Sequence, residues 1–190
     1  MASTPPVVSW MNLDESGNLV QATLWDAGIV EAGSTSKEFE FYVWNNYNGS
    51  SVVADMINVR ISVRDENGED VDKRICGEDT DTDKQASVNM MLFDAQQNSG
   101  AGDWGTFDDA LVWQSNVSAA LTAATPQFIN QCSGVTAVTT HGGTVSGAVN
   151  TGDLAADTNN YVHLKLSLTA KGSADAGTIK WITRVSYQYT

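Results

Sequence analysis

The stretch that decides the fold is KEFEFYVW, which runs from Lys37 to Trp44. Apolar and polar side chains alternate along it, with Phe39, Phe41 and Val43 on one face and Glu38, Glu40 and Tyr42 on the other. Successive side chains of a strand point to opposite faces of a sheet, so this period of two predicts a half-buried β-strand.

The same alternation returns on the C-terminal side of this stretch, from Ile57 to Arg64. The Asn67-Gly68 pair that follows is typical of a tight hairpin turn, because both residues readily adopt positive φ angles. The sequence therefore predicts that Val71–Ile75 returns as the partner strand of a hairpin.

Two long strands are predicted near the C-terminus. The first carries the apolar residues Val162, Leu164, Leu166 and Leu168, and the second carries Ile179, Trp181, Val185 and Tyr187 along one face. A plausible turn at Ala174–Gly177 between them favours an antiparallel pair. Further strands are expected at Val7–Met11, Val20–Trp25 and Ser87–Phe93.

Short strands with frequent turn signals, and no helical period long enough for βαβ units, predict an all-β fold. We expect a single domain over residues 1–190, an antiparallel β-sandwich of immunoglobulin-like or jelly-roll-like type. Its predicted core consists of Phe39, Phe41, Val43, Val59, Ile61, Val63, Leu164, Leu166, Ile179, Trp181 and Val185.

The segment from about Asp94 to Val135 breaks this pattern and is interpreted as an insertion into the domain. It holds a polar, glycine-containing loop at Gln97–Asp103 and an alanine-rich stretch at Asn116–Thr125, which suits either a short helix or an extended arm. Large aromatic residues in a segment without a regular period favour packing over the core or docking on a partner. The candidate protein-contact residues here are Trp104, Phe107, Trp113 and Phe128.

Charge excludes some classes of partner. The chain has 23 Asp and Glu against 10 Lys and Arg, a formal net charge of −13. Phosphate binding needs basic side chains, so we expect neither nucleic acid nor an anionic membrane as a partner. The opening MASTPPVVSW lacks the features of a secretion signal, and the expectation is a protein made and kept in the cytoplasm until it assembles. Free thiols are then favoured for Cys76 and Cys132, although their pairing stays open.

No catalytic residue, cofactor or metal site is expected. The two histidines, His141 and His163, occur in no metal-ligand spacing. The trio Asp79, Asp81 and Asp83 has the spacing that opens an EF-hand loop, but the required glycine and glutamate positions hold Lys84 and Met90. A looser calcium site on this acidic loop is the alternative.

Six tryptophans are many for this length. Indoles most often anchor cores and protein interfaces, although aromatic residues on a sheet can also stack on sugars. Trp44 and Trp104, both beside turn-forming residues, are the candidates for exposed contact.

Three stretches together resemble a small β-sandwich virion protein of tailed phages and prophages of Gram-positive bacteria. They are Phe41–Asn46 with Val53–Met56, Gly142–Asn150, and Asp157–Leu166 with the closing Thr183–Thr190. The resemblance implies a structural part of the particle, with a capsid decoration (auxiliary head) protein first and a tail or baseplate component second. A carbohydrate-binding module for host attachment is the alternative from another class. The implied partners are capsid or tail subunits and further copies of the chain.

Overall fold

The computed structural model describes residues 3–67, 73–76, 82–93, 110–111, 127–129, 136–137 and 144–190. Strands dominate this part of the chain, and the single helix in it is the four-residue α1 (Lys73–Cys76). The strands are β1 (Val8–Leu13), β2 (Leu19–Gln21), β3 (Phe39–Asn45), β4 (Ile57–Asp65), β5 (Ala86–Phe93), β6 (Ala110–Leu111), β7 (Gln127–Ile129), β8 (Thr136–Ala137), β9 (Tyr161–Ala170) and β10 (Trp181–Gln188).

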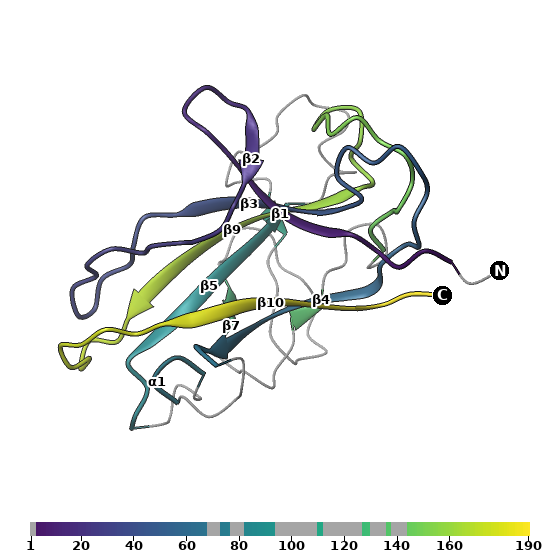
Figure 1. The fold of residues 1–190 in the computed structure, drawn as a ribbon. Coiled ribbons are helices and arrows are strands. Elements are labelled where there is room, and N and C mark those ends of the chain that lie inside the picture. Colours follow the sequence, from purple (N-terminus) through teal and green to yellow (C-terminus); the bar gives the residue numbers. More distant parts are fainter. Residues whose placement is uncertain are drawn as a thin grey trace.

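The strands form two sheets (Figure 1). The larger has seven strands in the order β2-β1-β3-β9-β5-β6, with β7 also paired to β5. The smaller has three strands in the order β10-β4-β8. Every pairing between the described strands is antiparallel. The prediction of a mostly β, antiparallel fold is therefore confirmed.

One hydrophobic cluster contains residues of both sheets. Phe41, Val43, Leu164 and Leu166 of the larger sheet are buried in it together with Val59 of β4. Four other predicted core residues, Phe39, Ile179, Trp181 and Val185, are partly buried against the same cluster. The side chains of Ile61 and Val63 lie outside the described residues. The alternation in the sequence thus located the core correctly wherever the structure describes it.

The predicted hairpin after β4 is wrong. Residues 73–76 form α1 instead of a strand, and β4 pairs with β10 on one side and β8 on the other. The single turn of helix places Ile75 in the hydrophobic cluster, where it is fully buried. Distant strands thus occupy both edges of β4, which leaves no edge for a local partner.

The expected pairing of the two C-terminal strands is also wrong. Strand β9 lies between β3 and β5 in the larger sheet, so both of its edges are taken. Strand β10 pairs with β4 in the smaller sheet, and the link at residues 171–180 crosses from one sheet to the other (Figure 1). The predicted strand at Val20–Trp25 is shortened to β2, and the chain from residue 22 to 32 continues as an irregular link.

Two short strands of the predicted insertion extend the larger sheet, because β6 and β7 both pair with β5. The alanine-rich stretch at residues 116–125 and the loop at 97–103 lie outside the described residues.

Side-chain amides hold the loops at the end of β3. Asn45 donates from Nδ2 to the carbonyl oxygens of Ala54 (2.9 Å) and Val145 (3.2 Å). Asn46, at φ 63°, donates to those of Ser51 (2.8 Å) and Gly147 (3.0 Å). The Val145 and Gly147 carbonyls also accept backbone N–H groups of Met56 and Val53, so the asparagine amides add to these backbone bonds and fix the loops against each other.

Candidate functional site

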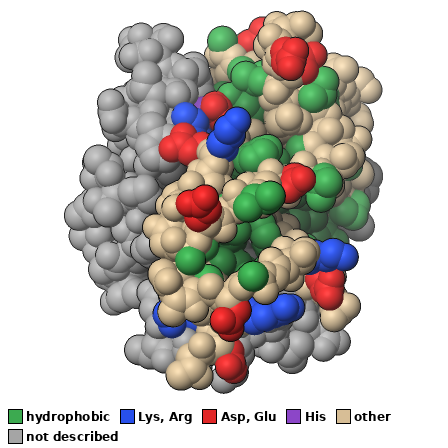
Figure 2. All heavy atoms as spheres, turned by 90° about the vertical axis from the view of Figure 1, so that its left-hand side faces the viewer, with side chains coloured by type: hydrophobic (Ala, Val, Ile, Leu, Met, Phe, Trp, Pro, Cys, Tyr) green, Lys and Arg blue, Asp and Glu red, His purple; other side chains and the backbone are tan. Residues whose placement is uncertain are grey.

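An apolar cleft opens beside the first residues of β10. It is lined by the link at residues 22–32 on one side and by residues 174–183 on the other, and its volume is about 1130 Å³. Figure 2 shows hydrophobic side chains gathered in a hollow on this face, with charged side chains around it. This cleft is the candidate functional site.

Aromatic rings line the cleft and pack edge to face. The ring centroids of Trp25 and Trp181 are 5.1 Å apart at 86°, and those of Trp10 and Phe41 are 5.9 Å apart at 81°. Such pairs contribute more than their buried area alone, so they stabilise this arrangement of the lining. The indole Nε1 of Trp25 is buried and has no hydrogen-bond partner among the described residues.

The apolar face of β10 is only partly covered. Along this strand partly buried and exposed residues alternate, and Trp181, Val185 and Tyr187 pack against the hydrophobic cluster from the partly buried positions. Strand β9, in contrast, is buried at eight of its ten positions. The residues of β10 that face the core therefore keep apolar area in contact with solvent, which a partner can cover.

Acidic side chains dominate the cleft's charge. Asp26, Glu31, Glu66 and Asp175 belong to its lining against one basic residue, Lys180. Lys180 Nζ lies 3.9 Å from Glu66 Oε2, whereas Asp26, Glu31 and Asp175 form no ion pair with any described residue. Leu24 and Ile29 add exposed apolar side chains on the link, with 81% and 99% of their surface accessible.

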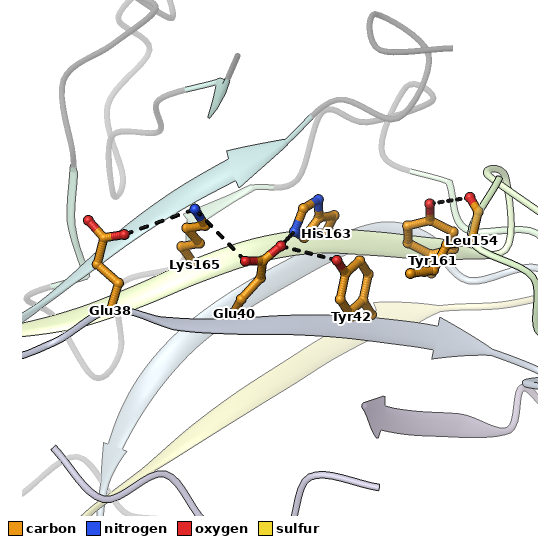
Figure 3. A network of polar contacts seen from close by, with 7 residues as sticks. All are labelled: Glu38, Glu40, Tyr42, Leu154, Tyr161, His163 and Lys165. Carbon is orange, nitrogen blue, oxygen red and sulfur yellow. Dashed lines mark hydrogen bonds and ion pairs between the residues drawn. The ribbon is translucent and has the colours of Figure 1, made fainter. Parts of the chain in front are cut away.

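A second group of polar residues lies on the opposite face of β3 and β9 (Figure 3). Glu40 Oε1 is 2.6 Å from His163 Nε2 and accepts a hydrogen bond of 3.1 Å from the Tyr42 hydroxyl. Lys165 Nζ lies 3.8 Å from Glu40 and 4.0 Å from Glu38. The rings of Tyr42 and His163 stack with centroids 4.4 Å apart.

Burial and the contacts within this group both shift the pKa values of its members. Desolvation lowers the pKa of His163 although the hydrogen bond to Glu40 acts in the opposite direction. Burial alone would raise the pKa of Glu40, but its bond to His163 and the nearby positive charge of Lys165 outweigh burial and lower it. Burial and the Glu40 carboxylate raise the pKa of the Tyr42 hydroxyl. We therefore assign a neutral imidazole that donates from Nε2 to the Glu40 carboxylate.

The His163 side chain has no solvent-accessible surface. A substrate cannot reach it in this conformation, so the group holds β3 against β9 and is not an accessible acid–base centre. Within the described ranges, no three His, Cys, Asp or Glu side chains gather closely enough to hold a metal ion. Of the trio with EF-hand spacing, Asp83 is exposed, while Asp79 and Asp81 lie outside the described residues, as do His141, Cys132 and the Cys76 side chain.

One predicted contact residue is placed differently from the expectation. Trp44 has no exposed surface and lies in a second buried cluster, where its ring is 4.6 Å from Tyr161 and 5.2 Å from Tyr47. The alternation in the sequence predicts one buried and one exposed face for β3 and places Trp44 on the exposed one. In the structure both faces are covered at the end of the strand that holds Trp44. Trp104, Phe107 and Trp113 lie outside the described residues. Phe128 belongs to β7, where it pairs with Asn89, and its side chain is not described.

Sequence reasoning did not single out the link at residues 22–32 as part of a site. Its only signals are the aromatic Trp25 and the two exposed apolar residues, because the link has no strand or helix period. Trp181 was predicted as a core residue, and it is the residue against which Trp25 packs.

No protein-family model matches the chain, and no curated protein sequence is similar enough to count as a relative. None of the described helices has the length and apolar character needed to cross a membrane.

Proposed function

We propose that this chain is a non-enzymatic structural protein of a phage particle, a capsid decoration protein that works by binding other virion proteins. The observation that carries the proposal is the open cleft lined by aromatic residues. Protein interfaces have an apolar, aromatic centre within a polar rim, and the cleft has this composition.

The arrangement of the strands supports the finer description of the fold as an antiparallel β-sandwich. Residues of both sheets share one hydrophobic cluster, as the two inner faces of a sandwich do. The fold is proposed to be of the immunoglobulin-like or jelly-roll-like type.

The resemblance to phage virion proteins gains support from the place of its motifs. Asn45 and Asn46 of the first stretch bond to carbonyl groups near Val145 and Gly147 of the second. Asn160 of the third stretch donates to the Ser146 carbonyl, 3.0 Å away. The three stretches, far apart in the chain, thus form one cluster of loops. A fold shared with the virion proteins would explain why these stretches occur together in one sequence.

A role in sugar binding has less support. It relied on exposed Trp44 and Trp104, and Trp44 is buried. A tail or baseplate position would use the same kind of protein contact and differs only in the partner.

The proposal is tested by identifying the genes on either side of this chain's gene, co-expressing the chain with those that encode capsid subunits, and measuring its occupancy in gradient-purified particles. We expect the chain to co-purify with particles. Replacing Leu24 and Ile29 together by Ser should lower occupancy at least about tenfold, because the apolar contact is then lost.

The matched control replaces Val52 and Val149 by Ser, since these are also exposed but are not among the residues that line the cleft. This control should leave occupancy unchanged. A chain that is absent from the particles would contradict the phage role. Equal occupancy of both double variants would show that the cleft is not the contact face.

A further inference from the structure

The cleft lies beside a strand edge that no described residue pairs with. Strand β10 is the outermost strand of the smaller sheet and forms its described pairs with β4 alone. The cleft is lined by residues 178–183, which include the first residues of this strand. An unpaired edge exposes backbone N–H and C=O groups that can accept a further strand.

The larger sheet is wider than the smaller one. Trp10 of β1 and Trp25 of the link at residues 22–32 line the cleft and pack against the shared cluster but are only partly buried. The core-facing residues of β10 are partly buried as well. An additional strand next to β10 would cover apolar surface from both sides of the cleft.

We propose that the cleft receives an extended segment of another virion protein, which pairs with β10 along residues 181–184, on the edge away from β4, and extends the β10-β4-β8 sheet. The virion origin of the partner rests on the proposed function, whereas the mode of binding rests on the cleft and the edge. Main-chain hydrogen bonds to β10 would provide affinity, and alternate apolar side chains would enter the cleft.

Charge defines the partner further. Asp26, Glu31 and Asp175 lack ion pairs with described residues, so the segment that binds here is basic at the end that reaches them. Arg184 is exposed farther along β10 and would repel a basic side chain there. The basic residues of the bound segment therefore lie near Asp26, Glu31 and Asp175.

The chain itself does not supply such a segment. No Lys or Arg occurs from residue 85 to residue 164, and the segments 68–72 and 77–81 hold only acidic charges. A second copy carries the same net charge of −13 and is repelled as a whole. The occupant is therefore a basic strand from a different protein.

The probe is the synthetic peptide KVTVTVTVK, which alternates apolar and polar residues and presents a lysine at the cleft whichever way it runs. Binding to the full chain is measured by calorimetry at low and high salt. We expect saturable binding, weakened by salt, and at least about tenfold loss of affinity for the peptide EVTVTVTVE. No binding of the lysine peptide at about millimolar concentration would overturn the proposal.

Two further measurements separate strand addition from simple apolar contact. Two peptides are methylated at alternate backbone nitrogens, one in each of the two possible registers. The peptide that loses the N–H groups facing β10 should no longer bind, whereas the other should still bind. Amide hydrogen exchange at residues 179–183 should slow when the unmodified peptide binds. Equal binding of the methylated peptides in both possible registers, or unchanged exchange at these residues, would refute pairing with β10.

The acidic lining is tested by Glu31→Gln with Asp175→Asn, which should weaken peptide binding several-fold and reduce its dependence on salt. The matched control, Glu15→Gln with Asp83→Asn, removes the same charge from exposed residues outside the cleft. Equal effects of the two double variants would contradict a specific role of the cleft charges. Because these assays contain no particles, the strand proposal can fail while the phage role holds, and the reverse is equally possible.

Discussion

At the scale of single residues, asparagine side chains join the loops at the end of β3. Asn46 adopts a left-handed backbone conformation, and its side-chain amide and its backbone carbonyl both bond to other loops. Gly49 is needed beside it, because a Cβ there would lie 2.0 Å from Asn46 Oδ1. The contacts of Asn45, Asn46 and Gly49 therefore give this sequence motif a structural role in holding the loops.

Replacing Asn46 by Gly tests the contribution of this amide. Glycine keeps the positive φ angle, so the variant removes the side-chain hydrogen bonds without adding backbone strain. We expect the free energy of unfolding to fall by about 2 kcal/mol, because the hydrogen bonds from this buried residue's amide to the Ser51, Gly147 and Ala148 carbonyls are lost. Urea denaturation measures this.

The control is Asn48→Gly, at another asparagine with positive φ (51°) whose side chain is exposed. Its effect should stay within about 0.5 kcal/mol. Equal losses for the two variants would show that backbone conformation, and not the amide of Asn46, stabilises these loops.

The buried His163 predicts a dependence of stability on pH. Its folded-state pKa is lowered from the usual 6.5, so below pH 6.5 the unfolded chain binds more protons than the folded chain. The contribution of the neutral His163 to the free energy of unfolding should therefore be fully present above pH 6.5 and should decrease as the pH falls below it. The lowered pKa of Glu40 adds a further loss only below its usual 4.5.

Denaturation curves at pH 7 and at about pH 5 compare the native chain with His163→Gln. The glutamine variant can still donate a hydrogen bond to Glu40 but does not titrate, so its stability should change less between the two values. His141→Gln, at the chain's other histidine, is the control and should keep the native pH dependence. An unaltered dependence in His163→Gln would refute the assignment.

At the scale of elements, alternation of side chains located strands but not their partners. β3, β4, β9 and β10 follow from local sequence, because each has an apolar face of period two. The partner strands of β4 and β9 lie at least 70 positions away in the chain, and no local signal carries that information. The burial of Trp44 was missed for the same reason.

The link at residues 22–32 is an element without regular structure, and Trp25 attaches it to the core. Trp25→Ala should lower the free energy of unfolding by about 2 kcal/mol, since a large side chain is only partly buried there. Hydrogen exchange in the link should quicken while that of β9 stays slow. A uniform increase over both would mean that the link and the sheet unfold as one unit.

At the scale of the whole molecule, the net charge bears on the class of the proposed partner, and the arrangement of the two sheets bears on its place of contact. The net charge of −13 favours a basic protein partner over nucleic acid, and the three uncompensated carboxylates of the cleft lining agree with it. The cleft itself could not be predicted, because it forms between a link without periodicity and a strand that crosses to the other sheet. Only the arrangement of the two sheets brings these segments together.

Electron cryomicroscopy of particles that carry this chain tests the central claim most directly. We expect density for an extended segment of a neighbouring protein that fills the cleft and pairs with the edge of β10 at residues 181–184. A chain bound to the particle with the cleft facing solvent and the β10 edge unpaired would contradict the account.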